Sequence, residues 1–336
     1  MLKNWFHLSN TPYAVPAMCT FAQIKSLMTH KKIISLLPAA TEILVALGLG
    51  ENLVGRSHEC DFPESIQQLP ACTSSKLNPE SSSLDIDNEV KDLLSDGLSI
   101  YNINKELIRE LAPDVVITQD QCAVCAVSLK EVEAVLGDLL DRNVEIISLK
   151  PATLDDILAD IQSVASVFGV QGRAELLVDE MRERINIIRH KLKFLENRPK
   201  VACIEWIQPL MVAGNWIPEL VGIAGGKAVL AENGKHSPFV DFKQIVQEDP
   251  EIILVMPCGY SIRQTLKEIN LLLELEGWSE LNAVKNNRIY IADGNQYFNR
   301  SGSRIVDSIE ILAEIINPKQ FVFGYEGKGW IRFNVL

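Results

Sequence analysis

Short apolar runs alternate with longer helical patterns along the first half of the chain. The runs are rich in β-branched residues and leucine, and they lie at residues 31–38, 52–57, 115–118 and 143–149. Runs this short and nearly continuous are typical of strands buried on both faces of a sheet. Helical patterns follow the first run and end before Pro113, so we predict a parallel sheet covered by helices on both faces.

The second half of the chain repeats this order. Apolar runs at residues 199–206 and 287–294 predict strands, and a helical pattern at 216–226 ends in Gly-Gly, a typical helix stop. The stretch IVQEDPEIILVMP has the same form as IRELAPDVVIT in the first half, with a helix, a proline, an acidic residue and an apolar strand. A repeat at this distance predicts two similar α/β lobes.

Two helices are predicted between the lobes, at residues 153–168 and 172–195. The second would span about 36 Å, long enough to join two lobes as a stiff strut and leave a ligand-binding cleft between them. We therefore divide the chain into a disordered leader at 1–30, an N-terminal lobe at 31–152, connecting helices at 153–197, a C-terminal lobe at 198–318 and a tail at 319–336.

Charge and cysteine content narrow the classes of function. The net charge of -12 repels a phosphate backbone, which argues against nucleic acid, and no apolar stretch approaches the roughly 18 residues of a membrane span. The seven cysteines are an odd number in a long chain, which favours free thiols in a reducing compartment. Prolines interrupt the first 30 residues, so we expect a cytoplasmic protein, with Met1 or Met28 as its start. Export is the alternative, if the leader is a degenerate signal.

Four side chains that commonly bind ligands follow the predicted strand at 52–57, a position where α/β folds place binding loops. They are His58, Glu59, Cys60 and Asp61. An ordinary polar turn would explain them equally simply, but the clustering favours a binding role.

A C-x-x-C pair, Cys122 and Cys125, follows another predicted strand. With His58 and Cys60 it could form a tetrahedral zinc site, whereas as small hydrophobic residues the two would pack beneath the cleft. The second C-x-x-C of a structural zinc site is missing, so we interpret the pair as pocket wall and keep the metal site as an alternative. No G-x-S-x-G or G-x-G-x-x-G pattern indicates a hydrolase or a dinucleotide site.

Four blocks together resemble the cobalamin- and iron-siderophore-binding family of ABC-transporter substrate-binding proteins, and most closely its cobalamin-binding subgroup. They are KIISLLPAATEILVALGLGENLVGRSHECDFP, LAPDVVITQDQCAVCAVS, CIEWIQPLMVAGNWIPELVGIAGG and DGNQYFNRSGSRIVDSIEILA. The resemblance implies an α/β fold of two Rossmann-like lobes with parallel sheets joined by a long rigid helix, the class III periplasmic-binding-protein fold. Glu59 stands where relatives have an aromatic residue, and residues 300–304 replace an R-P-G-P-R motif.

In the corrinoid-binding relatives, loops at the C-terminal ends of strands contact a flat ligand. Carried onto this chain, the resemblance implies the ligand-binding residues His58, Glu59, Cys60, Asp61, Gln119, Asp120, Glu205, Trp206, Trp216, Tyr297 and Arg300. The three aromatic residues among them are more often core residues when each is considered singly.

We therefore expect a non-catalytic, monomeric protein that holds a corrinoid or a related metal chelate and undergoes modest hinge motion. No cofactor is required, because the corrinoid is the ligand itself. An ABC-type permease is the partner if the chain is exported, and salvage or carriage is the role if it is cytoplasmic. The alternative is a metal-dependent enzyme or metal-binding protein that uses His58, Glu59, Cys122 and Cys125.

Overall fold

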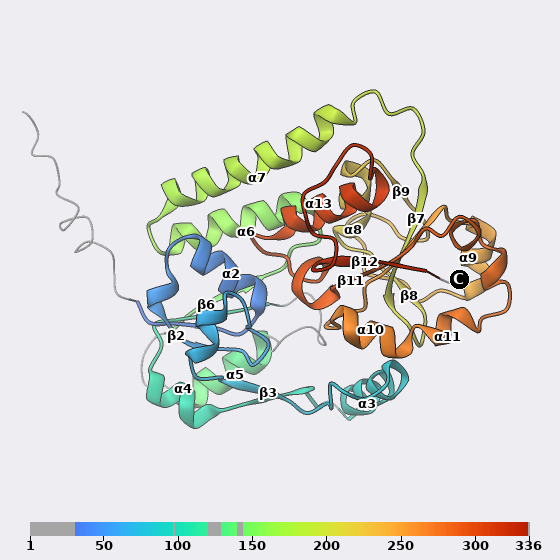
Figure 1. Ribbon diagram of the computed structural model, residues 1–336. Helices are drawn as coiled ribbons and strands as arrows, with labels where there is room; N and C mark the ends of the chain where they lie inside the picture. Colours follow the sequence, from blue (N-terminus) through green and yellow to red (C-terminus); the bar gives the residue numbers. More distant parts are fainter. Residues whose placement is uncertain (1–30, 97, 120–128, 140–143, 335–336) are drawn as a thin grey trace, which may run out of the picture. The chain divides into compact units, whose positions relative to one another are not determined.

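The computed structural model describes residues 31–96, 98–119, 129–139 and 144–334, which contain two main β-sheets (Figure 1). The first sheet is entirely parallel and has the order β2-β1-β5-β6. Its strands are β1 (Ile33–Ser35), β2 (Leu53–Arg56), β5 (Val115–Gln119) and β6 (Glu145–Leu149), and the helices of this half are α2 (Pro38–Ala46), α4 (Lys105–Leu111) and α5 (Leu129–Leu139). The predicted strands of the first half are thus confirmed.

The second sheet has six strands in the order β12-β11-β10-β7-β8, with β9 beside β7. Its strands are β7 (Lys200–Trp206), β8 (Met211–Val212), β9 (Lys227–Ala228), β10 (Ile252–Val255), β11 (Ile289–Ala292) and β12 (Trp330–Phe333). The helices around it are α8 (Ile217–Ile223), α9 (Phe242–Glu248), α10 (Ile262–Glu268), α11 (Asn270–Leu273), α12 (Asn282–Lys285) and α13 (Ile305–Ile316). Shorter turns lie at Gly50–Asn52, Glu64–Gln68, Trp278–Glu280 and Gly294–Phe298.

This second sheet is mixed, because β8 and β12 run antiparallel to their neighbours. β12 lies within residues 319–336, which the sequence-based division placed in a tail. The Trp330 ring packs edge-on against Tyr290, with ring centroids 5.6 Å apart, and its indole N–H donates to Glu314 at 2.7 Å. Burial of this large ring and its satisfied N–H fix the strand at the sheet edge.

The repeat seen in the sequence corresponds to a repeated backbone arrangement. Ala112 and Asp249 both adopt the left-handed conformation, each directly before a proline and a strand. The acidic residue after each proline then accepts a hydrogen bond from a backbone N–H at or just before the beginning of the neighbouring strand. Lys32 donates to Asp114 at 2.7 Å in the first half, and Lys200 donates to Glu251 at 3.2 Å in the second.

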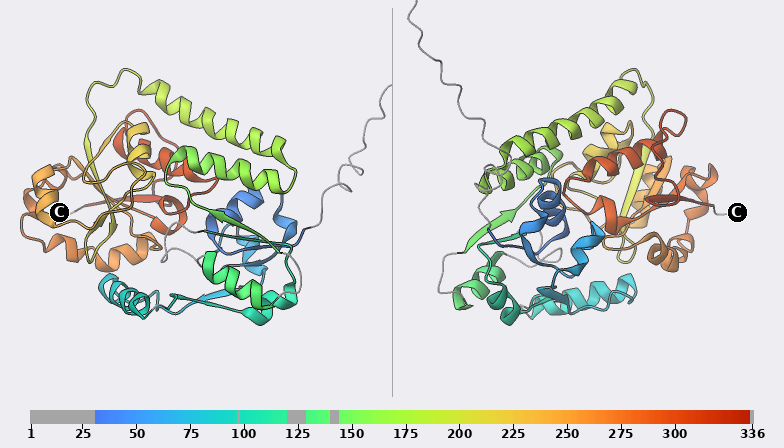
Figure 2. Two further views of the ribbon diagram at one scale, coloured as in Figure 1. Left: turned by 180° about the vertical axis from the view of Figure 1, so that it is seen from behind. Right: turned by 60° about the vertical axis from the view of Figure 1, so that its left-hand side comes forward.

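Helices α6 (Leu154–Val167) and α7 (Gln171–Lys191) connect the two halves, as predicted (Figure 2). A capping box at Thr153 and Asp156 begins α6, and basic residues in the last turn of α7 suit the negative end of the helix dipole. α7 packs against α6 and also against α13 of the second half. Arg184 of α7 forms ion pairs with Asp307 at 2.6 Å and Glu310 at 2.7 Å.

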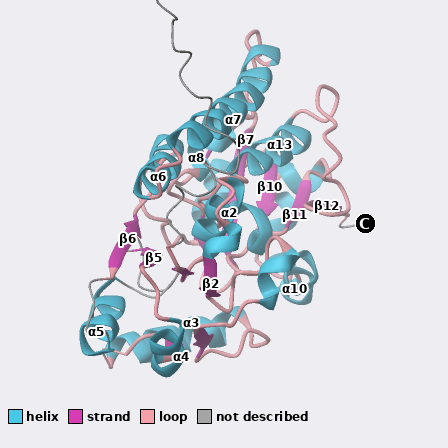
Figure 3. Cartoon of the chain, turned by 90° about the vertical axis from the view of Figure 1, so that its left-hand side faces the viewer, coloured by secondary structure: helices cyan, strands magenta, loops and turns pink. Residues whose placement is uncertain are grey.

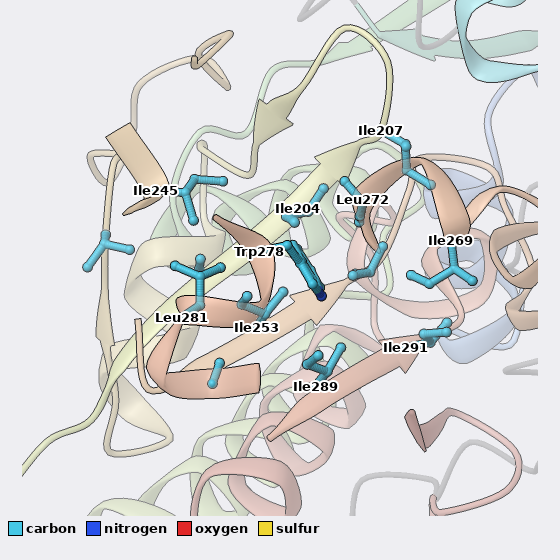
Figure 4. Close-up of a cluster of buried hydrophobic side chains, with 14 residues drawn as sticks. Ile204, Ile207, Ile245, Ile253, Ile269, Leu272, Trp278, Leu281, Ile289 and Ile291 are labelled. Carbon is cyan, nitrogen blue, oxygen red and sulfur yellow. The ribbon is translucent and has the colours of Figure 1, made fainter. Parts of the chain in front are cut away.

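A hydrophobic cluster covers one face of the second sheet around Trp278 (Figure 4). Ile204, Ile253 and Ile289 of the central strands belong to this cluster, and Ile245 adds the contribution of α9. A second cluster covers the first sheet with side chains from β1, β5, α4 and α5. The two sheets therefore have separate cores, which keeps the strand-end loops of each half in place.

One segment of the first half extends to the second half. It leaves the antiparallel pair β3 (Thr73–Ser75) and β4 (Tyr101–Ile103), and it contains helix α3 (Ser83–Ser95), whose N-terminus is capped by Ser82. Figure 1 shows α3 beside α10 and α11, far from α4, and in the view of Figure 3 it lies at the same end of the molecule as α4 and α5. We call residues 78–96 the arm.

Candidate functional site

The predicted binding segment after β2 lies against the antiparallel pair β3–β4. The Nδ1 atom of His58 lies 2.8 Å from the Thr73 hydroxyl, and the backbone N–H of His58 donates to the same oxygen at 3.1 Å. The His58 and Tyr101 rings are 5.7 Å apart. Burial, and secondarily the charge of Arg56, lowers the pKa of His58, so the imidazole is neutral at pH 7.

Glu59 has the most unusual environment of this segment. Burial raises the pKa of its carboxyl to about 7, although the Tyr101 hydroxyl donates to it at 3.3 Å and opposes that shift. The side chain therefore changes charge near neutral pH. At higher pH it is a hydrogen-bond acceptor at the end of a strand, and at lower pH it gains a donor.

Cys60 is completely buried, with 0% of its surface exposed. The Thr41 hydroxyl donates to its sulfur at 3.1 Å, and burial raises the pKa of the thiol to about 11. A neutral thiol beneath the loop packs as a small hydrophobic residue, and in this conformation it presents no surface to a ligand.

Asp61 connects this loop to the second half of the chain. One carboxylate oxygen forms an ion pair with Arg300 at 2.7 Å, and the other accepts from Gln296 at 2.7 Å and Asn295 at 3.2 Å. Asn295 and Gln296 lie on the turn after β11 and Arg300 follows it, so the predicted binding loops of the two halves contact each other directly. Here Asp61 and Arg300 bind one another.

Arg300 belongs to a buried ion-pair group that we call the junction, made of Glu42, Asp61, Arg300 and Arg304. Glu42 is 3% exposed and Arg300 is 4% exposed. Arg300 pairs with Glu42 at 2.9 Å, and Arg304 donates to both oxygens of Glu42 at 2.6 and 2.9 Å. Two carboxylates thus face two guanidinium groups, which compensates four charges that would otherwise be costly to bury.

The second half contributes an aromatic pair at the strand ends. The indole N–H of Trp206, the last residue of β7, donates to the carbonyls of Ser83 at 3.2 Å and Gln208 at 3.1 Å. Its ring meets Tyr260 edge-on, with centroids 5.4 Å apart. Glu205 precedes Trp206 and is half-buried.

The other two predicted aromatic contacts differ in exposure. Trp216 is only 6% exposed, and its indole N–H donates to the carbonyl of Phe298 at 3.0 Å. It therefore supports the turn after β11 from below. Tyr297 is half-buried and lies on the turn itself, 5.6 Å from the Arg304 guanidinium carbon and edge-on to Tyr325.

The residues after β5 that the sequence predicts to bind a ligand or a metal are only partly within the described residues. Gln119 is buried at the end of β5, whereas Asp120, Cys122 and Cys125 lie outside the described ranges. Among the residues that the structure describes, no group of three or more His, Cys, Asp or Glu side chains could hold a metal ion. The buried thiol of Cys60 is also a poor ligand while it is protonated.

Several residues of this region were not predicted from the sequence. They are Glu42, Thr73, Tyr101, Tyr260 and Arg304. Glu42 gave one usable signal, because it is a lone carboxylate in an otherwise apolar helix, and such a charge needs a partner when buried. The other four act through contacts with residues far away in the chain, which local sequence patterns do not show.

Comparisons with known proteins agree with this fold. A family model described as "Periplasmic binding protein" matches residues 33–295. An uncharacterized ABC transporter substrate-binding lipoprotein of Bacillus subtilis is 25% identical over 297 residues, covering 87% of this chain and 81% of the relative. A vitamin B12-binding protein of Vibrio parahaemolyticus is 23% identical over 285 residues, covering 84% of this chain and 88% of the relative.

Solved structures show the same fold. The periplasmic vitamin B12 binding protein of Vibrio cholerae has a TM-score of 0.62 and 21% identity, covering 86% of this chain and 98% of its own. The periplasmic heme-binding protein RhuT from Roseiflexus has a TM-score of 0.64 and 21% identity, with the same coverage.

These comparisons correct the predicted location. The relatives are a substrate-binding lipoprotein and periplasmic binding proteins, so the prediction of a cytoplasmic protein is wrong. That prediction relied on free cysteines and on prolines in the first 30 residues, and neither observation tests export directly. In the described part of the chain, no helix has the length and apolar character needed to span a membrane.

Proposed function

Because the chain belongs to the periplasmic binding protein family, we propose that it binds a cobalamin or a related corrinoid at the strand-end loops of its two halves. The family consists of solute-binding proteins, in agreement with the expectation of a non-catalytic role. An ABC-type permease is the partner that this proposal implies, and we continue to expect a monomer.

The charge pattern at the strand ends is the observation that supports a corrinoid most directly. Arg300 and Arg304 are both paired with Glu42. Glu59 instead places a carboxyl beside the Tyr101 hydroxyl at the end of β2. A corrin ring carries many amide side chains whose N–H groups need acceptors, whereas the two propionates of heme need basic partners.

The aromatic residues supply the apolar part of the proposed site. Trp206 and Tyr297 are half-buried at the ends of β7 and β11, so each has ring surface left for contact with a flat ligand. Trp216 contributes indirectly, because its hydrogen bond to Phe298 holds the turn that carries Tyr297. The relatives named for vitamin B12 support the same ligand class, and the structural neighbour named for heme defines the competitor to be tested.

Titration of the purified protein with cyanocobalamin, dicyanocobinamide, hemin and zinc, followed by absorbance and calorimetry, tests the proposal. We expect saturable corrinoid binding, and Glu59→Gln should weaken it more at pH 8 than at pH 6, because the wild-type carboxylate is ionised only at the higher pH. Glu276→Gln, at an exposed position, is the matched control. Tight binding of hemin or zinc without saturable binding of any corrinoid would overturn the ligand assignment.

A further inference from the structure

We propose that the arm, residues 78–96, is a gate that must leave the second half before a ligand can enter or leave the site. This inference rests on the proposed function, because it concerns access to the same strand-end loops. The contacts of the arm that support the inference all lie within the described residues, and sequence patterns did not predict them.

The base of the arm is connected to the first half of the site. Thr73 begins β3 and bonds to His58, and Tyr101 begins β4 and bonds to Glu59. The two strands pair antiparallel between these points, with Ser74 opposite Asn102. Movement of the arm is therefore transmitted to two residues predicted to contact the ligand.

The tip of the arm contacts the loops of the second half. Ser83 accepts the indole N–H of Trp206 through its carbonyl at 3.2 Å and donates its backbone N–H to Glu268 at 2.9 Å. The Tyr260 hydroxyl lies 3.5 Å from the carbonyl of Ser81. The tip thus lies next to the C-terminal ends of β7 and β10, the edge at which open α/β sheets bind ligands.

Further contacts hold the arm through surface groups. Glu80 forms an ion pair with Lys267 of α10 at 2.6 Å, and Gln264 donates to the carbonyl of Pro79 at 3.3 Å. Lys91 lies 5.9 Å from the centroid of the Phe239 ring. Both members of the Glu80–Lys267 pair are more than half exposed, so the contact is weak enough to break and reform.

A gate has a kinetic signature that a purely structural contact lacks. If the arm must open for entry and for exit, weakening its closed state raises the association and dissociation rates together and leaves Kd nearly unchanged. Loss of a structural support would instead raise the dissociation rate alone, and binding would therefore become weaker.

Stopped-flow measurement of cyanocobalamin association and dissociation tests this inference. We expect Glu80→Lys, which places two lysines together, to raise both rates about two- to fivefold. The double variant Glu80→Lys with Lys267→Glu restores the pair and should restore the rates. Adding Glu268→Ala to Glu80→Lys removes the acceptor of the Ser83 N–H and should raise both rates about tenfold. Lys285→Glu, in the exposed Glu280–Lys285 pair, is the control that should change neither rate.

Hydrogen–deuterium exchange of the amides of residues 78–96 shows whether each variant releases the arm. Faster exchange of the arm with unchanged association and dissociation rates would overturn the gate. An equal change of these two rates in Lys285→Glu would overturn it as well. Unchanged exchange in both arm variants would also overturn it, because the named contacts would then not hold the arm. If the wild type binds no corrinoid at all, the proposed function itself is overturned. That outcome is distinct from any difference in rates between the wild type and the arm variants.

Discussion

At the scale of single residues, Glu42 shows how a buried charge can determine the arrangement of two halves of a chain. It accepts from Arg300 and Arg304, which lie about 260 residues later in the sequence. Arg300 was predicted to contact a ligand because of its position after β11. In the structure its guanidinium is already bonded to Glu42, Asp61 and Asn295. These bonds hold the loop that carries Tyr297, and contact of Arg300 with a ligand stays a prediction.

Glu42→Gln should destabilise the protein strongly. The amide keeps the shape of the side chain but leaves the positive charges of Arg300 and Arg304 facing only Asp61. Removing one partner of a buried ion pair costs about 3 kcal/mol or more, so the free energy of unfolding in urea should fall by that amount. Glu280→Gln in the exposed pair with Lys285 should change it by less than about 1 kcal/mol. Equal effects of the two substitutions would contradict the importance of the junction.

Glu59 should make stability depend on pH. Its pKa is about 7 in the folded protein and about 4.5 in the unfolded chain, so the folded state retains a proton that the unfolded state has already lost. Stability therefore falls as pH rises between about 4.5 and 7 and changes no further from this group above 7. Glu59→Gln removes this loss and should be more stable than wild type by about 3 kcal/mol at pH 8 but not at pH 4. Urea unfolding at the two pH values measures the difference, and an equal difference at both would contradict this assignment.

At the scale of elements, the strands and the connecting helices could be predicted because each depends on local pattern. The run at 252–255 is buried at every position, and the helix at 171–191 follows its apolar residues closely. The arm could not be predicted in this way. The sequence of α3 alternates acidic and apolar residues, as a solvated surface helix does, and only contacts with Trp206, Tyr260 and Lys267 reveal its position.

The turn at Gly294–Phe298 offers a test of element geometry. A Cβ atom at Gly294 would lie 2.1 Å from the carbonyl oxygen of Pro257 and 2.7 Å from that of Met256. These are backbone atoms at the end of β10, so they cannot move aside without disturbing the strand. Gly294→Ala should therefore lower the free energy of unfolding by about 2–4 kcal/mol.

Gly172→Ala is the matched control for this substitution. Gly172 lies in the first turn of α7, and a Cβ atom there would meet nothing within 4 Å. Alanine favours helix, so this variant should be as stable as wild type or more stable by about 0.5–1 kcal/mol. Chemical denaturation compares the two variants directly, and tolerance of Gly294→Ala would show that the end of β10 can shift.

At the scale of the whole molecule, three connections between the two halves stand out among the residues that the structure describes. Helix α7 packs on α6 and α13, the junction pairs Glu42 with Arg300 and Arg304, and the arm contacts α10. The sequence predicts only modest hinge motion. This arrangement favours the same expectation, because a domain closure would have to break several of these contacts together. The same contacts explain why the gate is inferred at the arm, where the ion pair is exposed, rather than at the buried junction.

Small-angle X-ray scattering can test how far the halves move. If all three connections persist, addition of cyanocobalamin should change the radius of gyration of the wild type by less than about 1 Å. Combining Glu42→Gln with Glu80→Lys weakens two connections and leaves α7 in place, so the ligand-free variant should be more open and close measurably on binding. The pair Glu280→Gln and Lys285→Glu also neutralises one carboxylate and reverses one charge, but away from the junction and the arm, and it should behave as wild type. A large ligand-induced change in the wild type would show that neither the junction nor the arm restrains the two halves.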